Sequence, residues 1–487
     1  MSRKKDKYPV LDNVTIEAIA AEGNTVSHVD GMALFVPFAA PGDVCRVQVT
    51  KKRSNYREGR VLEFSQLSPH RTTPRCPHFG TCGGCKWQHV PYPLQLQAKE
   101  RLARETLTRI GHVQVEEYLP IVGYQPGENP YAYRNKLEFT FSNKRWLSFE
   151  EMERNRAYTP AERMGLGFHI PKMFDKVLHI QECFLGHPIA NEVRNFIFTY
   201  CTSRLEEYPF FDLRTQEGLM RTLTIRTTTR GDLMILLAFA YDAPEAIQAL
   251  LDALLDRFPR ISSLYYVING KANDSIADLT PVLYSGNPVI YEQMGSLVYR
   301  IGPKSFYQTN STQAKLLYDV AARFARIQPH EVVYDLYTGA GTIANYIASS
   351  ALKVVGIEYV AEAVADAALN RDANGITNTA FYAGDMKDLL TPAFVQEHGT
   401  PHVVITDPPR TGMHPDVIDV LRRVQPQRIV YISCNPATQA RDLALLTEGG
   451  AYRVAKSQSV DMFPHTHHLE NVALLLRGEP QNEQTPL

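Results

Sequence analysis

The C-terminal third of the sequence alternates between short apolar runs and amphipathic stretches, and this alternation constrains the fold more than any other feature. A helical pattern at 312–326 precedes the apolar run Val332–Leu336. Further apolar runs follow in KVVGIEYV, TAFYAGD, HVVITDPPR and RIVYISCNP, with helical stretches between them. Strands that alternate with helices form a parallel sheet with helices on both faces. The sequence therefore predicts a doubly wound α/β domain at 303–487.

The rest of the chain divides into two parts. Apolar and polar positions alternate over 10–66 between turn signals, which indicates a small OB-type β-barrel. Beyond the linker-like SPHRTTPR, strand-like and helical stretches mix. We therefore expect a barrel domain at 1–70 and an α+β central domain at 71–302. An amphipathic helix near 92–112 is expected to pack on the C-terminal domain.

Overall charge and hydropathy exclude several classes of protein. The 51 basic and 52 acidic residues leave a formal net charge of −1, so total charge indicates no polyanionic partner. No apolar run reaches the roughly 18 residues of a membrane-spanning helix. The basic N-terminus, MSRKKDKYPVL, is not followed by the apolar segment of a secretory leader. A cytoplasmic protein without membrane contacts is expected, and we expect a monomer.

The first apolar run of the C-terminal domain leads into a glycine loop, YTGAGT. Gly339 and Gly341 let the backbone approach a ligand closely, and the following helix presents its N-terminus there. Glu358 ends the second run, where a carboxylate can bind both hydroxyls of a ribose. Both NAD and S-adenosylmethionine fit such a Rossmann-like site.

Later strand ends separate these two cofactors. Asp385 follows the third run, and Asp407 begins DPPRTG after the fourth. An Asp-Pro-Pro turn at this place resembles S-adenosylmethionine-dependent methyltransferases that act on nucleic-acid bases. An NAD oxidoreductase would need a hydride-accepting site, of which the sequence gives no sign. Methyl transfer is therefore the favoured reaction.

A cysteine stands at the end of the fifth run, in VYISCNPATQARDL. Cys434 precedes Pro436, which stops the strand, so the thiol lies where ligands bind in open α/β sheets. Uracil C5 is a poor nucleophile, and a thiolate that adds to C6 makes it enolate-like. C5 then attacks the sulfonium methyl group, and a carboxylate must afterwards take the C5 proton so that the thiol can leave. Glu470, in FPHTHHLE, is the candidate, although it could equally be an N-cap or a surface charge.

Three histidines crowd before Glu470, at His465, His467 and His468. One interpretation is a metal site, but no second cluster with ligand spacing accompanies them. We favour a loop that imidazole hydrogen bonds shape.

Five motifs in the order SFYQTN, DLYTGAGT, DPPRTG, SCNPATQARDL and FPHTHHLE resemble the RNA 5-methyluridine methyltransferase family. They span 305–476. The resemblance implies methylation of uracil C5 in RNA, with Cys434 as nucleophile and Glu470 as general base. The predicted cofactor contacts are Gln308, Tyr337, Gly339, Gly341, Thr342, Glu358, Asp385 and Asp407. Gln308 and Asp407 are also expected near the bound base. One departure is that the family often carries Phe-Cys-Gly where Tyr337-Thr338-Gly339 stand.

Four of the seven cysteines form a second pattern, at Cys76, Cys82, Cys85 and Cys183. The compact CPHFGTCGGC favours a metal centre over chance, and its spacing leaves zinc and iron–sulfur open. The ribosomal branch of the family that the chain resembles carries a four-cysteine [4Fe–4S] cluster here, which the resemblance implies for this chain. Cys45 and Cys201 are interpreted as ordinary small apolar residues.

The expected RNA contacts lie in two places. The N-terminal barrel resembles a TRAM domain, an RNA-binding module, so TKKRSNYREGR offers Lys51, Lys52, Arg53 and Arg57 to phosphates. The alternative for this segment is a solvated hairpin tip. In YAYRNKLEFTFS, Arg134 and Lys136 precede a strand that the resemblance makes RNA-facing, or that forms a plain hairpin.

The substrate implied by the resemblance is 23S ribosomal RNA, since barrel and cysteines together are typical of that branch. The alternatives are the T-loop uridine of transfer RNA, and an inactive RNA-binding iron–sulfur protein.

Overall fold

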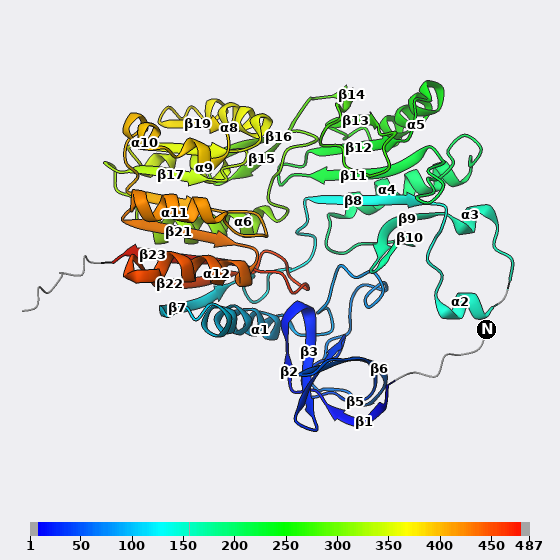
Figure 1. The fold of residues 1–487 in the computed structure, drawn as a ribbon. Coiled ribbons are helices and arrows are strands. Elements are labelled where there is room, and N and C mark those ends of the chain that lie inside the picture. Colours follow the sequence, from blue (N-terminus) through cyan, green and yellow to red (C-terminus); the bar gives the residue numbers. More distant parts are fainter. Residues whose placement is uncertain (1–7, 155, 479–487) are drawn as a thin grey trace, which may run out of the picture.

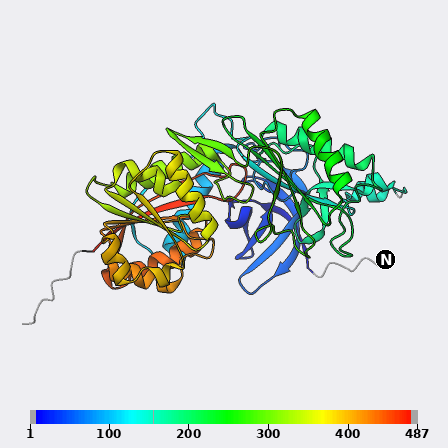
Figure 2. The same cartoon turned by 90° about the horizontal axis from the view of Figure 1, so that it is seen from above.

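The computed structural model describes residues 8–154 and 156–478, which form three sheet-based units around a central junction (Figures 1 and 2). Residues 1–7 lie outside the described residues. They include the basic residues that were considered as the start of a secretory leader. In the described part, no helix is long and apolar enough to cross a membrane.

The C-terminal unit is an eight-stranded sheet in the order β19-β18-β17-β20-β21-β23-β22-β7. All five predicted strands are present and pair in parallel, which confirms the doubly wound fold. Two antiparallel strands then extend it. The strands are β17 (Val332–Leu336), β18 (Lys353–Glu358), β19 (Thr379–Ala383), β20 (Val403–Thr406), β21 (Arg428–Ser433), β22 (Tyr452–Val460) and β23 (Glu470–Arg477).

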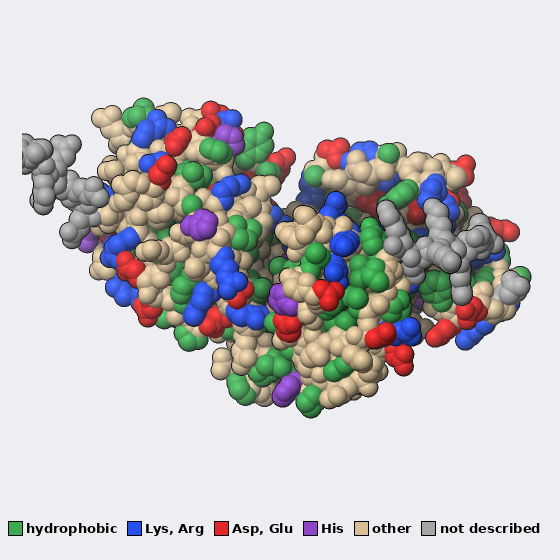
Figure 3. Space-filling model, turned by 60° about the horizontal axis from the view of Figure 1, so that its bottom comes forward, with side chains coloured by type: hydrophobic (Ala, Val, Ile, Leu, Met, Phe, Trp, Pro, Cys, Tyr) green, Lys and Arg blue, Asp and Glu red, His purple; other side chains and the backbone are tan. Residues whose placement is uncertain are grey.

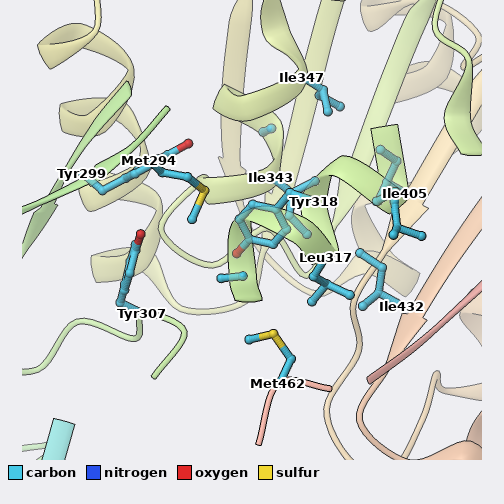
Figure 4. Close-up of a cluster of buried hydrophobic side chains, with 14 of the residues drawn as sticks. Met294, Tyr299, Tyr307, Leu317, Tyr318, Ile343, Ile347, Ile405, Ile432 and Met462 are labelled. Carbon is cyan, nitrogen blue, oxygen red and sulfur yellow. The ribbon is translucent and has the colours of Figure 1, made fainter. Parts of the chain in front are cut away.

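Helices cover both faces of this sheet, since each face is apolar. One core includes side chains of α6, α7, β20 and β21, together with Met462 (Figure 4). The other core lies on the α11 and α12 side. The helices are α6 (Ser311–Ala325), α7 (Thr342–Ile347), η3 (Ala348–Ser350), α8 (Ala361–Ala373), α9 (Met386–Leu389), α10 (Pro392–His398), α11 (Pro415–Val424), α12 (Pro436–Thr447) and η4 (Glu448–Gly450).

Elements from far upstream complete this unit. The edge strand β7 (Val115–Val122) pairs in parallel with β22. The helix α1 (Tyr92–Glu105) runs beside it and continues into a π-helical turn, η2 (Thr106–Ile110), which packs on α12. Gly111 lies so close to Ala440 that a Cβ there would meet the alanine Cβ at 2.7 Å. The C-terminal sheet thus includes a strand from the range predicted for the central domain.

The central unit is a seven-stranded mixed sheet, in the order β10-β9-β8-β11-β12-β13-β14, whose apolar core includes α4 and α5. The turn Arg230-Gly231-Asp232 joins β11 and β12 into an antiparallel hairpin. The elements are β8 (Lys136–Ser142), α2 (Phe149–Glu153), α3 (Pro160–Arg163), β9 (Gly165–Ile170), β10 (Met173–His179), α4 (Pro188–Thr202), β11 (Met220–Thr227), β12 (Leu233–Phe239), α5 (Pro244–Arg257), β13 (Ser263–Ile268) and β14 (Val282–Gly286). A separate ribbon, β15 (Ile290–Met294) with β16 (Leu297–Ile301), leads into the C-terminal unit.

The N-terminal unit is a six-stranded sheet, in the order β1-β5-β6-β4-β3-β2, that bends into a half-barrel (Figure 1). A small apolar core that includes Leu34, Val36 and Val47 fills it. Its elements are β1 (Val10–Thr15), β2 (Ala18–Ile19), η1 (Ala21–Gly23), β3 (Asn24–Val29), β4 (Met32–Pro37), β5 (Val44–Lys52) and β6 (Tyr56–Gln66).

Candidate active site

Cys434 lies in the short turn between β21 and α12, half-buried at the carboxyl edge of the sheet. Asn435 caps α12, since its side-chain oxygen accepts a hydrogen bond from the Ala437 amide at 3.1 Å. The same side chain donates to the Arg410 carbonyl at 3.0 Å. Pro436 is the first residue of the helix, where its missing N–H costs nothing. The turn therefore fixes the position of the thiol.

Glu470 stands beside Cys434 because β23 pairs antiparallel with β21. The register places Ser433 opposite Asn471, so the next position along each strand brings the thiol next to Glu470. The Glu470 side chain is buried, and its Oε2 has no hydrogen-bond partner. Burial, with a smaller effect of the Asp407 charge, raises its pKa well above the usual value. A buried carboxyl with a free oxygen and a raised pKa can accept a proton from a bound molecule.

The loop after β20 brings one negative and one positive side chain to the same place. Burial and the nearby Asp335 raise the pKa of Asp407. Arg410 contacts the Cys434 thiol, and its charge lowers the pKa of both Cys434 and Glu470. Burial, Glu470 and Asp407 still raise the pKa of the thiol to about 11. Arg410 belongs to the DPPRTG motif, but it was not among the predicted site residues, although a cation next to a nucleophilic cysteine is a recognisable signal.

The glycine loop after β17 forms an open cradle. Gly339 has φ +55° and a Cβ there would meet nothing within 4 Å, so its face is free for a ligand. Gly341 has φ +72° and no room, since a Cβ would meet Ala367 at 2.8 Å. Glu358 accepts hydrogen bonds from the Gly339 and Val360 amides at 3.1 and 3.0 Å. The cradle therefore joins the loop to the carboxylate that was predicted to bind a ribose.

Three more of the predicted cofactor residues border this cradle. Tyr337 has φ +63°, an unusual conformation for an aromatic residue, and burial raises its phenol pKa to about 12. The Thr342 hydroxyl lies 3.0 Å from the Tyr318 hydroxyl. Asp385 caps α9, accepting a hydrogen bond from the Lys387 amide at 3.2 Å.

Gln308 lies in the segment before α6, and the central sheet holds this segment. The Asn135 side chain donates to the Gln308 carbonyl at 2.9 Å, and its amide donates to the Thr309 carbonyl at 2.9 Å. Asn135 stands between Arg134 and Lys136, so these two predicted RNA contacts lie close to the Gln308 segment. Figure 3 shows a hollow between the C-terminal unit and the rest of the molecule, with Lys and Arg side chains along its rim.

The basic residues of the half-barrel lie elsewhere, on the β5–β6 hairpin. Lys51 pairs with Glu58 at 2.6 Å, and Arg57 pairs with Asp30 at 3.5 Å. Lys52 ends β5, and Arg53 starts the turn, where its amide donates to the Tyr56 carbonyl. The structure therefore places Lys51, Lys52, Arg53 and Arg57 together, but apart from Arg134 and Lys136.

The four predicted metal ligands gather in one region, and all seven cysteines are free. The Cys183 thiol contributes to raising the pKa of Cys76, Cys82 and Cys85, and burial is the main cause in each case. The Gln88 amide donates to the Cys85 sulfur at 3.2 Å. Among residues 8–154 and 156–478, however, no group of three or more His, Cys, Asp or Glu side chains is arranged to hold a metal ion. The metal site therefore stays a prediction, and the structure gives no support for one at the three histidines.

Comparison with known proteins places this geometry among RNA-modifying proteins. Residues 288–478 match the family described as tRNA (Uracil-5-)-methyltransferase, and residues 13–62 match the TRAM domain. An uncharacterized RNA methyltransferase of Porphyromonas gingivalis is 58% identical over 464 residues, which cover 95% of this chain and 99% of that protein. Another, from Bacteroides thetaiotaomicron, is 49% identical over 460 residues, covering 94% and 99%.

One solved structure is similar over almost the full length. It is the Pyrococcus abyssi tRNA (uracil-54, C5)-methyltransferase in complex with S-adenosyl-L-homocysteine. The two chains superpose with a TM-score of 0.71 at 26% sequence identity, covering 95% of this chain and 99% of the other.

Proposed function

The chain belongs to the S-adenosylmethionine-dependent RNA (uracil-5-)-methyltransferase family and carries an N-terminal TRAM domain, and we propose on this basis that it methylates C5 of uracil in 23S ribosomal RNA. The observation that carries the site assignment is the register of β21 and β23, which sets Glu470 beside Cys434.

In the proposed reaction the Cys434 thiolate adds to uracil C6 and pushes electron density onto C5. S-adenosylmethionine supplies the methyl group that C5 takes. Glu470 then removes the C5 proton, the C6–S bond breaks, and Cys434 leaves as the thiolate. The raised pKa of Glu470 suits it to hold this proton, and its free Oε2 gives the proton a place to go.

The residues around this pair receive supporting roles. Gln308 and Asp407 contact both the cofactor and the target base, whose ring nitrogens and carbonyls need polar partners when it is out of its stack. Gly339, Gly341 and Thr342 line the cofactor, Glu358 binds its ribose, Asp385 lies by the adenine, and Tyr337 offers a stacking face. Arg410 stabilises the thiolate form of Cys434.

We also propose a [4Fe–4S] cluster on Cys76, Cys82, Cys85 and Cys183. The donor set supports it, since four free, half-buried thiols share one region and Gln88 donates to one sulfur. A cluster would compensate the burial that disfavours four thiolates there. Its role would be structural or in positioning RNA, because methyl transfer moves no net electrons.

Anaerobic purification tests this assignment. The protein is expected to contain about four irons and four acid-labile sulfides per chain. Cys183→Ser is expected to lose most of both, because the remote fourth ligand closes the site, while Cys201→Ser keeps them. Zinc in place of iron, or full iron in the Cys183→Ser protein, would contradict the proposal.

Two kinds of RNA compete as the substrate. A TRAM domain together with the four cysteines supports ribosomal RNA. The structural similarity to the Pyrococcus abyssi tRNA enzyme supports transfer RNA as the substrate, since this similarity covers 95% of the chain. The proposed RNA-facing residues, Arg134 and Lys136 by the active site and Lys51, Lys52, Arg53 and Arg57 on the half-barrel, serve either substrate through phosphate contacts.

Mapping of 5-methyluridine separates these substrates. Cells that lack the protein are expected to lose this base at one or more sites of 23S ribosomal RNA and to keep it in transfer RNA. Mass spectrometry of nuclease fragments measures both RNAs from the same culture. Loss of 5-methyluridine from transfer RNA alone would show that the substrate is the T-loop uridine. As the control, re-expression of the protein is expected to restore the missing base.

A further inference from the structure

The loop that leads to Glu470, residues 461–469, is irregular yet mostly buried. It carries no regular secondary structure, so other parts of the chain satisfy its backbone groups. The Met462 carbonyl accepts from Asn310 at 3.0 Å, and the Pro464 carbonyl accepts from Tyr133 at 3.1 Å. The position of Glu470 therefore depends on contacts made from outside its own strand.

One face of α1 supplies most of the remaining contacts. Tyr92, Gln95 and Lys99 follow one another at helical spacing, so they lie on the same side of the helix. Gln95 Oε1 accepts from the His465 amide at 2.9 Å, and its Nε2 lies 3.2 Å from His465 Nδ1. Tyr92 donates to Asp461 Oδ2 at 2.8 Å. We call these three side chains the polar face of α1.

The centre of this contact is a fully buried ion pair. Lys99 Nζ lies 2.5 Å from Asp461 Oδ1, and both side chains are 0% exposed. The same ammonium donates to the Phe463 carbonyl at 3.0 Å, and Asp461 also accepts from the Phe463 amide at 3.2 Å. Buried ion pairs contribute little net stability because of desolvation, but separating the partners is costly, since each would be left as an unpaired buried charge.

The segment before α1 holds the middle of the loop. The Lys86 and Trp87 amides, next to Cys85, both donate to the His465 carbonyl, at 2.9 and 3.0 Å. His465 has φ +65° and stacks on Tyr131 with ring centroids 4.1 Å apart. Because a histidine seldom adopts such a φ unaided, these contacts keep the loop in this conformation.

We propose that Tyr92, Gln95 and Lys99 of α1 are positioning residues that hold the 461–469 loop so that the Glu470 carboxylate meets the C5 proton. This inference rests on the proposed role of Glu470. Methyl transfer uses Cys434, in the turn between β21 and α12, and does not depend on this face. Loss of the polar face therefore slows proton removal and product release more than it slows methyl transfer.

The test uses the full-length protein, methyl-labelled S-adenosylmethionine, and RNA extracted from cells that lack the protein. Lys99→Met is expected to leave methyl transfer in the first turnover within about threefold. Release of methylated RNA is expected to slow by about tenfold or more, because proton transfer needs exact placement of the carboxylate. Covalent RNA–protein complexes, seen on denaturing gels, are expected to accumulate.

Two further variants keep the outcome decisive. Tyr92→Phe keeps the ring and removes two hydrogen bonds of the hydroxyl, the one it donates to Asp461 and the one it accepts from the Tyr124 amide at 3.1 Å. It is expected to fold and to slow release by about threefold. If the Lys99→Met protein does not fold, the rate at which the Tyr92→Phe protein releases methylated RNA tests the positioning role. Lys456→Met is the matched control, since Lys456 pairs with Glu117 at 2.6 Å between β22 and β7, away from the loop. It is expected to change neither rate.

The results distinguish the positioning role from the role of Glu470 itself. If Glu470→Gln accumulates the covalent complex but Lys99→Met and Tyr92→Phe release product at the normal rate, the positioning role is wrong. Equal losses of methyl transfer and release in both variants would also overturn it. If Glu470→Gln does not accumulate the complex, it is the role of Glu470 that fails.

Discussion

Replacing Cys434 by alanine is expected to reduce methylation of RNA by at least about 10³-fold, because the reaction then lacks its nucleophile. Uracil C5 does not attack a sulfonium methyl without prior addition at C6. With RNA that contains 5-fluorouridine, the wild-type protein is expected to form a covalent adduct that denaturing gels resolve, since fluorine at C5 cannot leave as a proton. The Cys434→Ala protein is expected to form none.

The pH dependence of adduct formation follows from the thiol. Its pKa is about 11, so at neutral pH the thiolate is a small fraction. Initial rates are therefore expected to rise by about tenfold per pH unit from pH 7 upward, until the thiol is ionised or the protein unfolds. Removing the Arg410 charge in Arg410→Met is expected to lower the rates across this range.

Cys201→Ala is the matched control, because Cys201 is buried on α4 within the central core and far in the fold from β21. It is expected to form adducts at the wild-type rate. An adduct in the Cys434→Ala protein would show that another thiol attacks the base. If the rate did not change between pH 7 and pH 10, the pKa of the Cys434 thiol in the reacting complex would lie outside this range and would differ from the value in the free protein.

Replacing Glu470 by glutamine is expected to uncouple methyl transfer from product release. The amide keeps the shape of the side chain but cannot take the C5 proton. The first methyl group is therefore transferred, and the methylated RNA stays bound to Cys434. Steady-state turnover is expected to fall by about 10²- to 10⁴-fold, the usual contribution of a general base.

A burst experiment measures this uncoupling. One equivalent of labelled methyl group per protein is expected in RNA that migrates with the protein on denaturing gels. Glu117→Gln, an exposed change on β7, is the control and is expected to turn over normally. Normal release by the Glu470→Gln protein would assign proton removal to another group.

The sequence predicted the parts of the fold in which local pattern and tertiary structure agree. Each parallel strand from β17 to β21 is a largely apolar run that ends at a turn, so both the strands and the residues at their ends could be located. The glycine cradle was predictable for the same reason, since positive φ at Gly339 and Gly341 is a property of the residues themselves.

The contacts that the sequence did not predict all join distant segments. The strand β7 reads VEEYLPIV, and its two glutamates and its proline give no clear strand pattern. Lys99 falls within an amphipathic helix, where a lysine is usually solvated, and only the fold shows that Asp461 buries it. Arg410 lies in the DPPRTG motif, but its proximity to the thiol depends on the hydrogen bond from the Asn435 side chain to its carbonyl.

The place of β7 at the sheet edge also affects synthesis of the protein. Its partner β22 begins about 330 residues later in the chain. At the usual rates of translation, β7 and α1 leave the ribosome roughly 15 to 65 s before that partner exists. An unpaired edge strand can join other nascent chains, and charged residues and proline protect against this. Glu116, Glu117 and Pro120 within β7 are protective features of this kind.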